Sequence, residues 1–214
     1  MMKILKLLNT ILISVVITIS VYLSVFDIIN NNIYEILIKL FVIPVILLPK
    51  ILRKNGFKIY LSEEIIYTLF IFVSYFLGSI IDLYNKIYFY DTLMHFLSGV
   101  LTSILALDIL KRANVIDKNK IYINVLFVFG ITFMVAGLWE IFEFTTDNIF
   151  GKDAQKVLTT GVSDTMKDII SAFLGSLIIV VSYIYEKVNN MKLFVINFIK
   201  SIGWLYEQRR NNKT

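Results

Sequence analysis

Cysteine is absent from this chain of 214 residues, proline occurs only twice, histidine once, and charged residues make up 17%. The lack of cysteine excludes disulfides, thiolate metal sites and thiol nucleophiles. Hydrophobic residues make up 57%, whereas a soluble domain has about 45–50% apolar and about 25% charged residues. This composition excludes a soluble globule and a disordered chain, and it indicates a helical protein that crosses a membrane several times.

Six apolar runs are long enough to cross a bilayer, which takes about 20 residues in a helix. We therefore predict an all-α, polytopic bundle of six transmembrane helices. Residues 1–190 form the transmembrane domain, and residues 191–214 form a cytoplasmic amphipathic tail that lies on the membrane interface or packs on the bundle. The predicted spans cover residues 4–25, 33–52, 62–83, 88–110, 121–144 and 166–186.

Lysine and arginine are distributed unequally between the two sides of the predicted bundle. Sixteen of the 21 basic residues fall in the N-terminal segment, the second and fourth loops and the C-terminal segment. This bias predicts that both termini are cytoplasmic and that the protein is a multi-pass protein of the cell membrane. The formal net charge of +5 follows from the same bias, so it indicates membrane lipid as the partner and gives no reason to expect nucleic acid.

Titratable residues gather at the predicted outer ends of four helices. A charge at the bilayer centre costs about 2.5–3.5 kcal/mol, so charges kept within spans are candidates for function. Six of the seven form pairs spaced three or four residues apart, and each pair therefore shares one helix face. Gly99, Gly137 and Gly175 lie near the pairs and favour close helix approach. The seven residues are Asp82, Asp91, His95, Glu140, Glu143, Asp164 and Asp168.

Carboxylates packed side by side cannot all ionise without a cation or shared protons, because like charges raise one another's pKa. A divalent metal satisfies this need, and oxygen ligands with one imidazole suit Mn, Fe, Zn or Mg without choosing among them. One histidine cannot supply the two E-x-x-H motifs of a di-iron bundle. We predict Asp91, His95, Glu140, Glu143 and Asp168 as metal ligands, with Asp82 and Asp164 as further members of the pocket.

Each pair also has a structural interpretation. Thr165-x-x-Asp168 resembles a helix capping box, and an acid near a helix start is favoured by the helix dipole. Asp91 and His95 fit a hydrogen-bonded pair four residues apart. The two glutamates fit carboxylates that reach the membrane interface beside a tryptophan.

Three motifs carry a family resemblance. They are D-T-L-M-H-F-L-S-G at 91–99, G-L-W-E-I-F-E at 137–143 and S-D-T-M-K-D-x6-G at 163–175, all within residues 80–180. This half of the chain resembles the YjdF-like family of uncharacterised bacterial inner-membrane proteins. It is more distantly similar to VanZ-like proteins, which carry a D-x-x-x-H span, a later acidic span and a D-x-x-x-N-x-x-G span, although Ala172 replaces that asparagine. The resemblance implies a small polytopic membrane protein, and its VanZ-like part implies an envelope or glycopeptide-tolerance role.

The sequence supports three classes of function. The first is a metal-dependent enzyme that acts on a lipid-linked or envelope substrate through an outward-facing acidic and histidine pocket. The second is a non-catalytic membrane binding or envelope-stress protein. The third, a proton- or cation-coupled transporter, is less favoured because the charges gather at one end of the helices. No catalytic residue is assigned, since the chain contains no G-x-S-x-G, H-E-x-x-H or phosphate-binding glycine motif.

Overall fold

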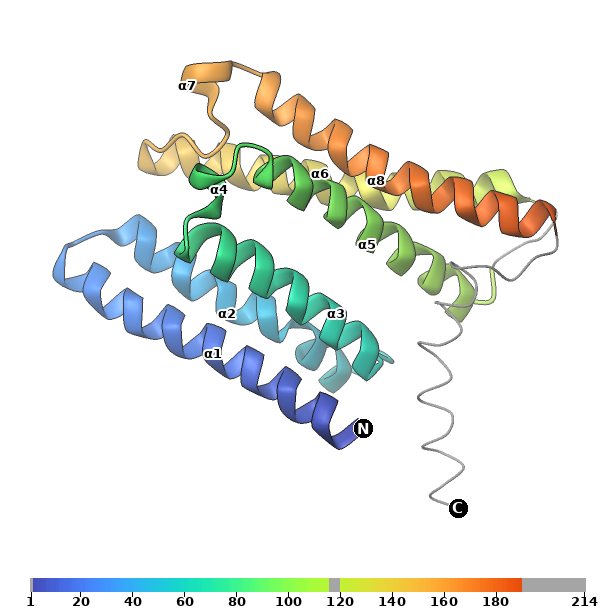
Figure 1. Ribbon diagram of the computed structural model, residues 1–214, viewed down its shortest axis with the longest axis horizontal. Helices are drawn as coiled ribbons and strands as arrows, with labels where there is room; N and C mark the ends of the chain where they lie inside the picture. The colour runs from blue at the N-terminus through green and yellow to red at the C-terminus, as the bar shows by residue number, and fades with distance from the viewer. Residues whose placement is uncertain (1, 116–119, 190–214) are drawn as a thin grey trace. The chain divides into compact units, whose positions relative to one another are not determined.

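The computed structural model describes residues 2–115 and 120–189, and every regular element in that part of the chain is a helix (Figure 1). The described residues form two compact units. Unit 1 covers residues 2–87 and unit 2 covers residues 88–189. The helices of unit 1 are α1 (Met2–Ile29), α2 (Ile33–Lys54), α3 (Leu61–Ile71), the π-helix η1 (Phe72–Ile80) and α4 (Leu83–Lys86). Those of unit 2 are α5 (Tyr90–Arg112), α6 (Ile121–Phe150), α7 (Val157–Thr160) and α8 (Ser163–Val188).

Each of the six predicted spans corresponds to a helical segment, so the predicted all-α, multi-pass architecture is confirmed. Five segments in the described chain are long and apolar enough to cross a membrane, and α2 supplies a further helix of 22 residues. α2 carries Glu35 and Lys39 within its first two turns. The main shift in boundaries is in α6, which continues to Phe150 instead of ending at residue 144. The five segments are Lys3–Ile29, Leu61–Ile80, Tyr90–Arg112, Ile121–Phe150 and Ser163–Val188.

Unit 1 is held together by a cluster of mostly branched aliphatic side chains and by a hydrogen bond to a backbone carbonyl that Pro49 leaves free. α1, α2 and η1 bury a cluster around Val16, Ile46 and Tyr75. α2 runs through both of its prolines without ending. Pro49 has no N–H for the carbonyl of Val45, and the hydroxyl of Tyr67 donates to that carbonyl instead at 2.7 Å. A partner from α3 therefore keeps the backbone of α2 satisfied in an environment without water.

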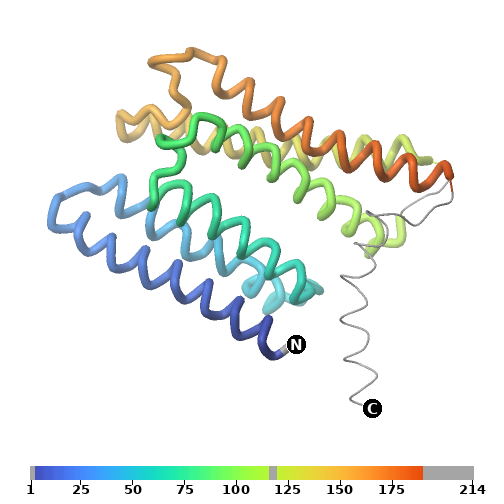
Figure 2. The backbone as a smooth tube through the Cα atoms, viewed as in Figure 1, coloured from blue at the N-terminus to red at the C-terminus, as the bar shows by residue number. Residues whose placement is uncertain are grey.

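Unit 2 is a three-helix arrangement in which α5 and α8 approach each other very closely (Figure 2). A Cβ atom added at Gly99 would lie 1.9 Å from the carbonyl oxygen of Ala172, and one added at Gly175 would lie 2.1 Å from that of Phe96. Two of the three predicted close approaches are confirmed, whereas a Cβ at Gly137 would meet nothing within 4 Å. α6 packs against both helices, so the start of α5, the end of α6 and the start of α8 lie at one end of the unit.

Hydroxyl groups join the three helices of unit 2 half-way along their length. Ser103 donates to Ser176 at 2.7 Å, and Thr132 donates to Ser176 at 3.2 Å. All three side chains are fully buried. Such interhelical hydrogen bonds satisfy polar groups that lipid cannot, and they set the register of the helices.

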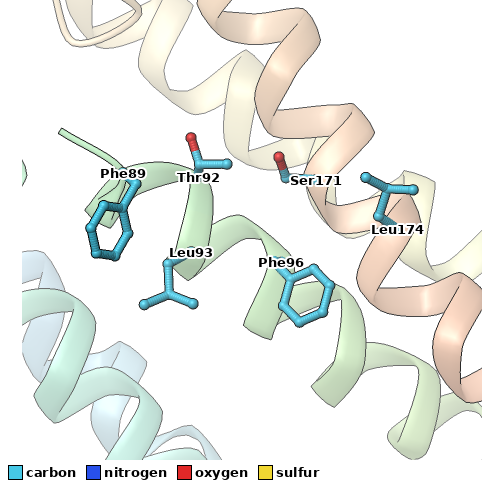
Figure 3. Close-up of a pocket in the computed structure, with 6 residues that line it drawn as sticks. All are labelled: Phe89, Thr92, Leu93, Phe96, Ser171 and Leu174. Atoms are coloured by element: carbon cyan, nitrogen blue, oxygen red, sulfur yellow. The ribbon is translucent and has the colours of Figure 1, made fainter.

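A shallow groove of about 290 Å³ lies on α5 and α8 in the half of unit 2 that contains the acidic residues (Figure 3). The groove is mostly apolar, with two hydroxyl groups at its edge. Its lining residues are Phe89, Thr92, Leu93, Phe96, Ser171 and Leu174.

Two predictions about organisation stay predictions. Nothing in the fold tests the cytoplasmic position of the termini or the boundary of one transmembrane domain at residue 190. The predicted amphipathic tail of residues 191–214 lies outside the described residues.

Candidate metal centre

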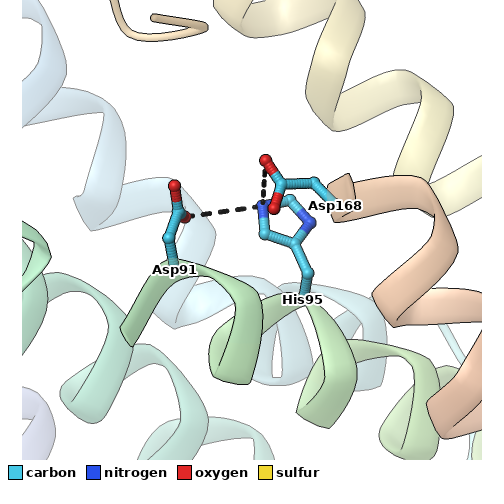
Figure 4. A group of neighbouring side chains, drawn as sticks. All are labelled: Asp91, His95 and Asp168. Atoms are coloured by element: carbon cyan, nitrogen blue, oxygen red, sulfur yellow. Dashed lines mark ion pairs between the residues drawn. The ribbon is translucent and has the colours of Figure 1, made fainter. Parts of the chain in front are cut away.

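Asp91 and His95 lie one turn apart at the start of α5 and point toward the same space (Figure 4). Nε2 of His95 is 3.7 Å from Oδ1 of Asp91. The second carboxylate is that of Asp168 on α8, whose Oδ2 is 3.8 Å from the same nitrogen. His95 and Asp168 are buried and Asp91 is half-buried, so the imidazole lies between two carboxylates with little access to water.

The three side chains form a group that can hold a metal ion. One donor atom from each of Asp91, His95 and Asp168 lies within 4.8 Å of the others. Two donors that bind one metal at about 2.0–2.6 Å cannot lie more than about 5 Å apart, and this group meets that condition. Three protein ligands leave coordination positions for water or substrate, which is the arrangement of catalytic metal sites.

The capping-box interpretation of Asp168 is wrong. α8 begins at Ser163, so Thr165 and Asp168 both lie within the helix, and the N-cap residue Val162 makes no side-chain capping bond. Asp168 is therefore free of a capping role and faces His95. The close packing at Gly99 and Gly175 brings the two helices near enough for this contact.

Lys156 is the cation of the cluster and was not predicted from the sequence. Its Nζ lies 2.7 Å from Oδ2 of Asp91 and 3.2 Å from Oδ2 of Asp164. Partial burial lowers the pKa of Lys156, but hydrogen bonds and charge attraction from the two aspartates outweigh it, so the pKa is raised above its ordinary value. Asp164 thus joins the cluster through Lys156. The signal in the sequence was that packed carboxylates need a cation. A lysine in the adjacent loop meets that need as well as a metal does.

The loop between α6 and α8 is ordered by a carboxylate that was not singled out in the sequence. Asp147 accepts the backbone N–H of Ala154 at 2.8 Å and that of Gln155 at 3.0 Å. Lys156 follows directly and has a φ of +52°, a left-handed conformation that is strained for a lysine. The two aspartate contacts of its side chain and the fixed backbone before it hold this conformation.

Glu140 lies near the loop on α6, outside the group of three. Nε2 of Gln155 donates to the backbone carbonyl of Glu140 at 3.2 Å and to Oε2 of the same residue at 3.3 Å, and it also contacts Oγ1 of Thr165 at 3.2 Å. Oε1 of Glu140 is buried and has no hydrogen-bond partner in the described structure. A buried carboxylate oxygen without a partner is costly, so it marks a position for a proton, water or ligand.

The remaining two predicted residues have other partners. The carboxylate of Glu143 accepts Nε1–H of Trp139 at 2.9 Å, and Glu143 is not part of the group of three. Asp82 belongs to unit 1, where its Oδ1 accepts Nδ2–H of Asn85 at 2.7 Å. The structure therefore brings together three of the five predicted ligands, and the ligand roles of Glu140 and Glu143 stay predictions.

The sequence of this chain matches the model of the predicted membrane protein family DUF2238 over residues 8–190. The chain belongs to this family, and it is a multi-pass membrane protein. Family membership is consistent with the YjdF-like resemblance of its motifs, whereas the VanZ-like resemblance stays a prediction.

A protein of Thermotoga maritima described as uncharacterized is 34% identical over 107 residues. The match covers 49% of this chain and 53% of the relative, so the chain spans about half of that protein's length. No solved structure matches the chain.

Proposed function

We propose that this protein is a divalent-metal-dependent membrane enzyme that acts on the headgroup of a lipid-linked or envelope substrate. The observation that carries the proposal is the group formed by Asp91, His95 and Asp168, whose donor atoms lie within 4.8 Å of one another at one end of unit 2. Asp168 comes from a different helix than Asp91 and His95, which supports the proposal because the group is more than a pair of neighbours along one helix.

The charges of the cluster support a cation at this position. Asp91, Asp164 and Asp168 bring three carboxylates to a region where Lys156 is the paired lysine. One divalent ion offsets the remaining negative charge and replaces the need for shared protons. The metal would polarise the substrate oxygen and lower the pKa of a coordinated water.

Glu140 is the carboxylate suited to take a proton from water. In the proposed reaction, water held at the site gives one proton to Oε1 of Glu140 and attacks the phosphorus or carbonyl carbon of the headgroup. The bond to the leaving oxygen breaks, and the same proton passes to that oxygen. A positioned general base of this kind contributes about 10²–10⁴-fold to a rate.

A transporter is less well supported because a buried hydrophobic layer separates the acidic cluster from the buried polar residues at the other end of unit 2. Beyond the hydroxyl groups of Ser103, Thr132 and Ser176, the described helices bury a hydrophobic layer that would interrupt an ion path. This layer consists of Ala106, Leu107, Val128, Ile179, Val180 and Tyr183.

Metal content tests the site directly. We expect the wild-type protein, purified in mild detergent and analysed by inductively coupled plasma mass spectrometry after loading with Mn²⁺ or Zn²⁺, to hold about one ion per chain. His95→Ala and Asp168→Asn should each reduce metal affinity by about 10–100-fold or more. Asp108→Asn is the matched control, because this carboxylate pairs with Arg112 at the other end of α5, outside the group of three, and its replacement should leave the metal bound. A metal-free wild type that is folded and monodisperse would disprove the proposal.

Glu140→Gln separates an enzyme from a binding protein. The variant keeps an uncharged group of the same shape and should retain the metal, because Glu140 lies outside the group of three. We expect release of inorganic phosphate from lipid-linked phosphate substrates to fall by about 10²–10⁴-fold. Bound metal without turnover in wild type, with any such substrate, favours the binding protein.

A further inference from the structure

The groove on α5 and α8 uses the same two helix segments as the candidate metal centre. Thr92 follows Asp91 in the chain, Phe96 follows His95, and Ser171 lies one turn beyond Asp168. The groove and the metal group therefore use the same segments in the N-terminal halves of α5 and α8 (Figures 3 and 4). Successive residues of a helix point about 100° apart, so the two features lie on neighbouring faces of these segments.

The chemistry of the groove fits a hydrocarbon chain. Phe89, Leu93, Phe96 and Leu174 line it, and all but Phe89, which directly precedes α5, belong to helices long and apolar enough to span the membrane. A volume of about 290 Å³ is at the lower limit of small-molecule pockets, which range over about 300–1,000 Å³. The lining includes no charged residue, so this space is suited to a chain rather than to a sugar or a peptide.

The chemistry of the neighbouring site fits an anionic headgroup. The side chain of Lys156 is 38% exposed, so its ammonium group is reachable while it contacts Asp91. A lysine together with a divalent metal is the combination that recognises a phosphate in many phosphate-binding proteins. Thr92 follows Asp91 in the chain, and its hydroxyl is one of the two polar groups in the otherwise apolar lining of the groove (Figure 3).

We propose that the groove binds the hydrocarbon chain of a membrane lipid whose phosphate headgroup occupies the Asp91–His95–Asp168 site. This inference rests on the proposed function and specifies its substrate class as a lipid phosphate. From Asp168 to Leu174 the helix rises about 9 Å, so the groove receives the first part of the chain next to the headgroup.

Photolabelling tests whether the groove binds the hydrocarbon chain of a lipid phosphate. The probe is phosphatidic acid with a diazirine in its acyl chain, presented in phosphatidylcholine nanodiscs to the metal-loaded, full-length protein. We expect the label on peptides that contain Phe89, Leu93 and Phe96, and we expect at least five-fold less label with a phosphatidylcholine probe of the same chain. Equal labelling by both probes would show only annular lipid and would overturn the inference.

A matched pair of substitutions tests the groove itself. Leu174 and Ile178 are one turn apart on α8 and are 46% and 54% exposed, but only Leu174 lines the groove. Leu174→Trp fills the space and should reduce labelling of α5 at least five-fold, whereas Ile178→Trp should leave it unchanged. Should Leu174→Trp not fold, Leu93→Trp provides the same block from α5. Undiminished labelling in a folded groove variant would overturn the inference.

Metal content of the same samples keeps the two proposals apart. Leu174→Trp should hold as much metal as wild type, because it changes none of the ligands. A wild type that holds its full metal content but shows no selective labelling would disprove the lipid site and leave the metal site standing. Selective labelling of a wild type that binds no metal would support the lipid groove and disprove the metal centre.

Discussion

The two units of this protein differ in the charge balance of their buried clusters. In unit 1 two cations have carboxylate partners: Lys39 contacts Asp27 at 2.7 Å and Glu35 at 2.8 Å, and Arg53 contacts Glu64 at 2.6 Å. Glu35 and Lys39 lie four residues apart on α2, the spacing of neighbours on one helix face, and Asp27 on α1 joins their pair.

In unit 2 the balance is uneven. Lys156 is shared between Asp91 and Asp164, while Asp168 faces only the imidazole of His95 among the ion pairs of the described residues. Lys39 in unit 1 also contacts two carboxylates, so a shared cation does not by itself distinguish the units. Unit 2 adds a third carboxylate, Asp168, beside an imidazole, and an unpaired buried charge is costly. This additional negative charge is the physical difference between a cluster that stabilises helices and one that is suited to bind a cation.

The units also differ in how their helices meet. Unit 1 packs branched side chains from α1, α2 and η1 against one another. Unit 2 brings α5 and α8 into backbone contact at Gly99 and Gly175. Close backbone contact tolerates little change, so the substitutions that best separate the units begin there.

The largest effect is expected at Gly99. Gly99→Ala places a methyl group where the backbone oxygen of Ala172 lies 1.9 Å away, so α5 and α8 must separate. We expect a loss of stability of about 3 kcal/mol or more, measured by thermal unfolding in detergent, together with weaker metal binding. Gly137→Ala is the control, because it meets nothing within 4 Å and should keep or raise stability through better helix propensity. Equal loss in both variants would contradict the close contact.

A smaller effect is expected from Lys39→Met in unit 1. The lysine side chain is only 12% exposed, and its removal leaves Asp27 and Glu35 without their cation. We expect a loss of stability of about 1–3 kcal/mol that added Mn²⁺ or Zn²⁺ does not restore. Restoration by metal would show that unit 1 also holds a cation site, and the contrast between the units would fail.

In unit 2, Lys156→Met should reduce the stability of the protein by less than Lys39→Met does in unit 1. The side chain of Lys156 is more exposed, and solvent screens its ion pairs. We expect a fall of a few degrees in the unfolding temperature of the metal-free protein, reversed by Mn²⁺ or Zn²⁺, which then bind more tightly. A metal affinity equal to that of wild type would contradict the idea that Lys156 and the metal share Asp91.

The pH dependence of Lys156 follows from its raised pKa. A lysine whose pKa is raised on folding contributes its full stabilisation below its ordinary pKa of about 10.4, and the contribution is lost as pH rises through the folded value. The difference in unfolding temperature between wild type and Lys156→Met should therefore be constant from pH 6 to 9 and shrink only in strong alkali. A difference that disappears near neutral pH would contradict the assignment.

The smallest effect is expected at Ser176. Ser176→Ala removes the acceptor of the hydrogen bonds from Ser103 and Thr132 in the middle of unit 2. Interhelical hydrogen bonds in membranes average about 0.6 kcal/mol, so we expect a loss of this size in thermal unfolding and no change in metal content. A loss of metal would show that the hydroxyl layer extends to the site.

Local patterns predicted most of the secondary structure and part of the site. The hydropathy of each run placed the six helical segments within a few residues, except for the longer end of α6. Helical periodicity alone placed Asp91 and His95 on one face, because residues four apart are neighbours on any α-helix. The same rule treated Glu140 and Glu143 alike, yet Gln155 contacts the first and Trp139 the second.

The contacts that no local pattern predicted all join distant segments of the chain. The hydroxyl of Tyr67 donates a hydrogen bond to the carbonyl that Pro49 leaves free. Lys156 contacts Asp91, which lies 65 residues earlier in the chain. Such contacts depend on the angle and distance between helices, which are set by packing at a few positions such as Gly99. A periodic pattern along one helix carries no information about that angle.

Composition and hydropathy determined that this chain is a helical membrane protein. Apolar runs of about 20 residues are stable in lipid, and there a helix satisfies all the backbone hydrogen bonds within each run. Periodicity determined which acids share a helix face. The tertiary structure alone decided which faces meet, and it selected Asp168 and Lys156 as the neighbours of Asp91. The physical reason is that ligand geometry requires agreement within about 1 Å, and only close packing between helices sets positions that finely.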